Sequence, residues 1–183
     1  INNVLDRLEL DGRTFSLPEL TRHVATRLNR PALWEEDPEN ADVSIAFAAQ
    51  DPITVRLQDN RIELKLAIAE LRKAERSWKD FEARTFYKPQ VEGRSIELAR
   101  DGVVELYCPK LGTVARVALR GVFARIFLKN RPWTLSPEML IDHPKLADVA
   151  FTQFVIDGGW IGAALGPVNG AAPAAEGRLT MRP

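Results

Sequence analysis

The chain has 183 residues, of which 45% are hydrophobic and 27% charged, and its 25 basic side chains balance 25 acidic ones. This length suits a single domain with a sizeable core, and the zero net charge gives no reason to expect nucleic acid as the partner. No apolar run approaches the roughly 18 residues that a membrane-spanning helix needs.

The N-terminal region is predicted to be helical. "INNVLDRLEL" forms either a helical turn or the end of a longer helix, and a helix over residues 16–29 follows within "SLPELTRHVATRLNRP". Ser16 stands at the N-cap and Glu19 three residues later, which is the capping-box arrangement. Pro31 ends this helix. One apolar stripe runs along it and consists of Leu17, Leu20, Val24 and Leu28.

A strand at residues 42–49 is predicted to precede a hairpin over 51–71. Asp59 and Asn60 both tolerate positive φ, so they form a two-residue turn. The resulting register sets Leu57 opposite Ile62, Val55 opposite Leu64 and Ile53 opposite Leu66, with Arg56 opposite Glu63 on the other face. Apolar pairs and a charge pair therefore fall into place together.

Further strands are predicted at residues 78–89 and in a second hairpin over 94–107. In that hairpin a three-residue loop, Arg100-Asp101-Gly102, pairs Leu98 with Val104 and Ile96 with Leu106.

The C-terminal part changes character at residue 113. Residues 113–133 carry a helical stripe, a short helix starts at Ser136, and a final hairpin spans 147–166 around Asp157-Gly158-Gly159. Residues 167–183 are rich in Ala, Gly and Pro, which is typical of a tail or linker. We therefore expect one α+β domain over residues 1–166, followed by the tail.

Catalysis finds little support in the sequence. It contains no phosphate loop, no Rossmann glycine fingerprint and no HExxH pair. Cys108 is the only cysteine, and with His23 and His143 it is interpreted as structural rather than catalytic. The acidic residues 34–42 lack the spacing of a calcium loop. We therefore expect no enzyme activity, no catalytic residue, no cofactor and no metal site.

One segment is strongly basic. From Leu106 to Pro137 the chain has six basic residues and no acidic one. Either this segment is a core-packing helix whose arginines pair with acidic strand faces, or it lies on an anionic membrane surface. Nucleic acid is disfavoured because the aromatic residues suit core positions. The residues predicted to contact an anionic surface are Arg116, Arg120, Arg125, Lys129 and Arg131.

Three parts of the chain carry a resemblance to known proteins: "INNVLDRL", the strands from 42 to 107, and the amphipathic "VARVALRGVFARIF". In order and pattern they resemble bacterial exported lipid-binding domains of the tubular (TULIP-like) kind, and they are similar to small periplasmic lipoproteins. The resemblance covers residues 1–166 and matches no specific motif, so no functional residue is carried over. It implies a curved antiparallel meander sheet packed on amphipathic helices, an apolar cavity between them, an extracytoplasmic location in the periplasm or cell envelope, and no catalysis. Because residue 1 is Ile rather than Met, the start is interpreted as trimmed, with any signal peptide outside this chain.

Two functional hypotheses follow. The first is a non-enzymatic domain that binds a lipid or another apolar ligand between sheet and helix. Its pocket would be lined by Leu64, Leu66, Ile68, Phe123 and Phe127. The alternative is a structural or protein-interaction module of a cell-envelope protein, with a core filled by its own side chains. The expected partners are accordingly a lipid, a membrane surface or another protein.

Overall fold

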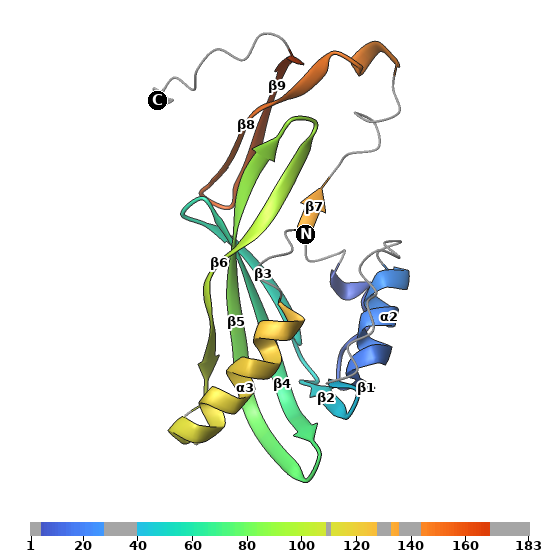
Figure 1. Cartoon of the computed structure of the whole chain (residues 1–183), viewed down its shortest axis with the longest axis vertical. Helices are drawn as coiled ribbons and strands as arrows, with labels where there is room; N and C mark the ends of the chain where they lie inside the picture. Colours follow the sequence, from blue (N-terminus) through green and yellow to red (C-terminus); the bar gives the residue numbers. More distant parts are fainter. Residues whose placement is uncertain (1–4, 28–39, 109–110, 128–132, 136–143, 169–183) are drawn as a thin grey trace.

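The computed structural model describes residues 5–27, 40–108, 111–127, 133–135 and 144–168. Most of them lie in antiparallel strands, with two α-helices, so the class is α+β as predicted (Figure 1). The helices are α2 (Leu17–Arg27) and α3 (Thr113–Ile126), and Pro144–Leu146 form a 3-10 turn. The strands are β1 (Thr14–Ser16), β2 (Val43–Phe47), β3 (Ile53–Gln58), β4 (Arg61–Lys73), β5 (Arg76–Glu92), β6 (Ser95–Tyr107), β7 (Trp133–Leu135), β8 (Val149–Asp157) and β9 (Trp160–Pro167).

Seven of these strands form one open sheet in the order β1-β2-β4-β5-β6-β7. β3 also pairs with β4, so β2 and β3 lie end to end along the same edge of that long strand. Ala67 spans the break between them: its carbonyl accepts from the Ala48 amide at 3.0 Å, and its amide donates to the Pro52 carbonyl at 2.9 Å. The remaining strands, β8 and β9, form a separate two-stranded sheet.

The predicted β3–β4 hairpin is confirmed in detail. Asp59 and Asn60 have φ of 50° and 54°, which is the two-residue turn whose twist matches that of the strands. The observed pairs include Leu57 with Ile62, Val55 with Leu64, Ile53 with Leu66, and Arg56 with Glu63.

The predicted second hairpin over 94–107 is wrong. β6 runs unbroken from Ser95 to Tyr107 and pairs with β5, and the chain turns earlier, at Gly93 (φ 58°). Gly102 does adopt the left-handed conformation (φ 78°), but it produces a bulge within β6 rather than a turn. The alternation of apolar and polar residues within 94–107 cannot distinguish a hairpin from one long strand. The deciding factor is β5, which covers residues 76–92 and supplies a partner for all of β6.

The α2 helix begins with the predicted capping box. The Ser16 amide donates to Glu19 Oε2 at 2.8 Å, and the Glu19 amide donates to Ser16 Oγ at 3.4 Å. Two of the orphan N–H groups at this helix end are thereby satisfied. The α3 helix ends at Ile126, earlier than its predicted limit of 133. The predicted helix at Ser136 and the acidic residues 34–39 lie outside the described residues.

One hydrophobic core joins α2, α3 and one face of the sheet. Phe123 of α3 is fully buried, and its ring meets Phe81 of β5 edge-on at 6.0 Å. Each large apolar side chain buried in this way contributes about 1.5–3 kcal/mol, so the burial of this face stabilises the fold.

The predicted final hairpin is confirmed as β8–β9, with Gly158 and Gly159 in its turn. Two turns of the large sheet hold β8. The Phe151 amide donates to the Gly93 carbonyl at 2.9 Å, while the Asn60 amide donates to the Ile156 carbonyl at 3.2 Å. β8 thus links the β5–β6 turn to the β3–β4 turn.

Candidate functional site

The five predicted ligand-lining residues all lie in the hydrophobic core. Leu64, Leu66, Ile68, Phe123 and Phe127 are between 0% and 7% exposed. The rings of Phe123 and Phe127 stack on each other with centroids 6.1 Å apart. The structure therefore brings these residues into one cluster, where their contacts are with the protein's own side chains.

An open hollow of about 410 Å³ lies beside the break between β2 and β3. It is lined by Ala48, Ala49, Ala67, Ile68, Ala69, Asp80, Phe81, Glu82 and Tyr107. Four of its nine lining residues are alanines, whose small side chains leave space, and Ile68 is the one residue that it shares with the predicted ligand-lining set. Asp80 and Glu82 add carboxylates to the lining, and the charge of Glu82 is compensated by Lys65 at 3.2 Å.

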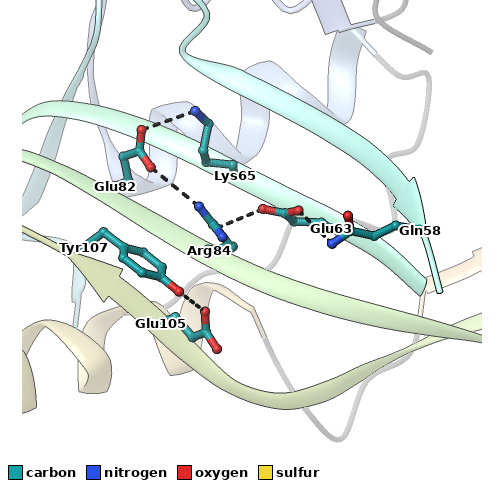
Figure 2. A network of polar contacts seen from close by, with 7 residues as sticks. All are labelled: Gln58, Glu63, Lys65, Glu82, Arg84, Glu105 and Tyr107. Carbon is teal, nitrogen blue, oxygen red and sulfur yellow. Dashed lines mark hydrogen bonds and ion pairs between the residues drawn. The ribbon is translucent and has the colours of Figure 1, made fainter. Parts of the chain in front are cut away.

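A polar network crosses the sheet (Figure 2). The strand register places it on the face opposite to Leu64 and Leu66. Its members are Gln58, Glu63, Lys65, Glu82, Arg84, Glu105 and Tyr107. Arg84 Nε lies 2.8 Å from Glu63 Oε1, and Lys65 Nζ lies 3.2 Å from Glu82 Oε1. The Arg84 guanidinium also sits over the Tyr107 ring, 4.5 Å from its centroid.

Glu63 is the unusual member of this network because only 3% of it is exposed. A buried carboxylate requires charge-assisted partners, and it receives them from Arg84 and from Gln58 Nε2 at 3.3 Å. The sequence predicted the strand pair of Glu63 with Arg56 but not its diagonal ion pair with Arg84. The burial of Glu63 had no signal in the sequence, where charged residues at alternate positions indicate a solvated face.

Tyr107 is held at the edge of the same network by its hydroxyl, which donates to Glu105. This hydrogen bond to a carboxylate raises the pKa of Tyr107, with a smaller contribution from burial. The network is thus held by ion pairs and hydrogen bonds between neighbouring strands, which is the behaviour of cross-strand pairs that stabilise a sheet, although the buried Arg84 Nε makes an ion pair with Glu63 without a well-aligned hydrogen bond.

His23 lines a second hollow, between α2 and β1, of about 450 Å³. Its Nε2 lies 2.7 Å from the Leu8 carbonyl oxygen and therefore donates to it, and its ring lies 5.0 Å from that of Phe15. These contacts fix the imidazole between backbone and core, so its role in this geometry is structural. Cys108 is also buried, with Sγ 4.0 Å from the Lys79 carbonyl oxygen.

The predicted basic surface is described in part. Arg116 and Arg120 lie on the exposed side of α3, and Arg116 Nη2 donates to the Cys108 carbonyl at 3.2 Å. The same side presents Val114 and Val117, which are 80% and 64% exposed. Arg125 belongs to α3, whereas Lys129 and Arg131 lie outside the described residues. Neither of the two α-helices that the structure describes is long and apolar enough to cross a membrane.

Among the strands that the structure describes, β9 is the most exposed apolar one. Its sequence, "WIGAALGP", carries no charge, and seven of its eight residues are exposed. Trp160 is 81% exposed, while Ile161 and Leu165 are each about half exposed. β9 pairs with β8 on one edge, and its other edge has no strand partner among the described residues. An exposed apolar edge strand is a template for pairing with another chain, and the sequence had shown this segment only as half of a hairpin.

Compared with family models, curated proteins and solved structures, the chain matches none of them. The resemblance to tubular lipid-binding domains therefore stays a prediction, and the function has to be argued from the geometry of the chain itself.

Proposed function

We propose that this chain is a non-enzymatic protein-interaction domain, in which a curved sheet packed on amphipathic helices carries the β8–β9 hairpin as its binding arm. The observation that supports this proposal most is the uncharged, exposed strand β9. Large exposed apolar surface is costly in water, and in monomeric proteins such patches mark sites of interaction.

The attachment of the arm favours the same function. Asn60 and Gly93 form hydrogen bonds with the backbone of β8, at Ile156 and Phe151, so the large sheet holds the arm at two points. These bonds leave the outer edge of β9 available to a partner. A partner strand that adds to β9 gains main-chain hydrogen bonds without rearranging the large sheet. The hydrophobic core, which includes Phe151 of β8 as well as the five residues expected to line a ligand pocket, would instead give the arm a rigid support.

Site-specific photo-crosslinking tests this function in the host cell. A photoreactive amino acid replaces Trp160 on β9, and the matched control replaces Val103, an exposed residue in the β6 bulge. We expect a discrete protein adduct from position 160 and none from 103. Equal labelling at both positions would contradict the proposal, and a lipid found by native mass spectrometry of the gently purified protein would favour apolar-ligand binding instead.

A second candidate function is contact with an anionic membrane surface through α3. The specific observation is that Val114 and Val117 share the solvent side of this helix with Arg116 and Arg120. Apolar residues flanked by arginines suit the boundary between headgroups and acyl chains. Each arginine near such a surface contributes about 1 kcal/mol.

Sedimentation with liposomes tests this candidate. We expect binding to vesicles that contain anionic lipid at low salt, and weaker binding for an Arg116→Gln/Arg120→Gln variant. The matched control is Arg56→Gln, an exposed arginine on β3. Absence of sedimentation of the native protein at low salt would exclude this candidate.

A further inference from the structure

The pairing of β9 with β8 determines which backbone groups of β9 point outward and can form hydrogen bonds with another strand. In a two-residue hairpin the residues that flank the turn, here Asp157 and Trp160, form a hydrogen-bonded pair, and such pairs alternate along the strands. Even-numbered residues of β9 therefore bond to β8. The Val168 amide, which donates to the Asp148 carbonyl at 2.8 Å, continues this alternation past the end of the strand.

Odd-numbered residues of β9 consequently direct their backbone groups outward. Ile161, Ala163 and Leu165 each present one N–H and one C=O to the open side, whereas Pro167 has no N–H to offer. The available pairing surface is thus three residues long and is centred on Ala163.

We propose that β9 pairs antiparallel with β9 of a second copy of this chain, about a two-fold axis at Ala163. This inference rests on the proposed function and names the partner. In that register Ala163 faces Ala163 of the second copy, and Ile161 faces Leu165. All three are hydrogen-bonded pairs, so every outward donor and acceptor of Ile161, Ala163 and Leu165 is satisfied at once.

The side chains suit the same register. Ile161 and Leu165, both about half exposed, lie on the face of the hairpin that carries the buried Ile156, so their pairing extends the existing apolar surface across the two-fold axis. On the opposite face, Trp160 falls directly opposite Gly166 of the second copy. Its indole would lie over the Gly166 backbone and the Thr152 methyl, which comes within 2.9 Å of where a side chain at Gly166 would begin. An aromatic side chain across from a strand glycine is a favourable pair.

The absence of charge on β9 suits pairing with a second copy. In this register every residue of β9 from Trp160 to Gly166 faces another residue of the same strand sequence, and like charges directly opposite each other destabilise a sheet. β9 has no charged residue, in a chain with 27% charged residues, so pairing with itself meets no such repulsion. The product is a four-stranded sheet, β8-β9-β9-β8, that leaves neither copy of the β9 edge open.

Ala163→Pro is the matched test of this pairing. Proline at 163 removes only the outward N–H, so the ladder with β8 keeps its bonds, and proline is tolerated on an edge strand in that orientation. By analytical ultracentrifugation we expect the native chain to form dimers as its concentration rises, and the variant to associate at least about tenfold more weakly. A native chain that stays monomeric up to about 1 mM would overturn the inference.

A charge exchange tests the register. Ile161→Lys alone sets lysine against Leu165 of the second copy and should weaken the dimer, as should Leu165→Glu alone. The double variant sets lysine against glutamate twice across the axis and should restore association. Failure of the double variant to recover, with its circular dichroism spectrum unchanged, would overturn this register.

Amide exchange of the native protein gives a measurement that needs no variant. On dimerisation the amides of Ile161, Ala163 and Leu165 should gain protection, while Gly162 and Ala164, already bonded to β8, should change little. Uniform protection of odd and even amides would contradict the pairing. If the native chain is monomeric but position 160 still crosslinks to another protein, the pairing with a second copy is wrong and the proposed function is supported.

Discussion

Asn60 and Ile156 lie 96 residues apart in sequence and are joined by two hydrogen bonds. The Asn60 amide donates to the Ile156 carbonyl, and the Ile156 amide donates to Asn60 Oδ1, each at 3.2 Å. Asn60 thus serves two purposes: its positive φ closes the β3–β4 turn, and its side chain anchors the β8–β9 arm.

Asn60→Gly separates these two purposes. Glycine keeps the positive φ without strain but removes Oδ1, so the turn should persist while the arm loses one bond, worth about 1 kcal/mol. We expect the Ile156 amide to exchange several-fold faster with solvent, as measured by NMR. Asp59→Gly, at the neighbouring turn position, is the control. Unchanged protection of the Ile156 amide would show that Asn60 is not an anchor.

Glu63→Gln should destabilise the fold through Arg84. The two side chains are 4% and 28% exposed, and the change leaves the guanidinium next to a neutral amide in a largely buried place. We expect a loss of about 1–3 kcal/mol in the free energy of unfolding, measured by urea denaturation. The control is Glu105→Gln, at the rim of the same network, which should cost less. An equal loss of unfolding free energy in both variants would show that the burial of Glu63 gives its ion pair no additional strength.

Glu70 should respond to acid only at very low pH. Hydrogen bonds from Arg72 and then Ser77 lower the pKa of Glu70 to about 2. Because the folded pKa lies below the value of about 4.3 in an unfolded chain, the stabilisation is complete above pH 4.3 and is lost as the pH falls through about 2.

An NMR titration of the Glu70 carboxylate checks this pKa. Arg72→Gln should raise the midpoint, whereas Arg56→Gln on β3 should leave it in place. A midpoint near 4.3 in the native protein would contradict the observed geometry.

Phe123→Ala should be among the most damaging single changes in the chain. This side chain is fully buried between α3 and β5, and truncation of a buried phenylalanine costs about 3–5 kcal/mol. Val117→Ala, on the solvent side of the same helix, should change the free energy of unfolding by less than about 0.5 kcal/mol. Chemical denaturation measures both variants, and a tolerated Phe123→Ala would show that this contact does not support the fold.

Local chemistry explains which parts of the architecture the sequence could predict. The capping box at Ser16, the Asp59-Asn60 turn with its register, and the Gly158-Gly159 hairpin all depend on residues within a few positions of one another. Caps and tight turns of this kind can be predicted from short sequence patterns. The α+β class followed from the order of these elements.

The structure departs from the expectation where partners are distant. The left-handed backbone of Gly102 fits both a hairpin turn and a bulge. The position is a bulge because β5 is long enough to pair with β6 on both sides of it. Likewise, the burial of Glu63 depends on its ion pair with Arg84 of the next strand. The exposure of β9 depends on its having β8 as a neighbour on one edge.

The sequence by itself thus determined the helix cap, the turns at Asp59-Asn60 and Gly158-Gly159, the register of β3 with β4, the β8–β9 hairpin, and the apolar face of the sheet. Only the tertiary structure decided which side chains that face packs against, that Asn60 anchors the arm, and that the outer edge of β9 has no strand partner in the part of the chain that the structure describes. The physical reason is that turn and cap energies arise from neighbouring residues, whereas burial and edge exposure arise from strands that meet across tens of residues of chain.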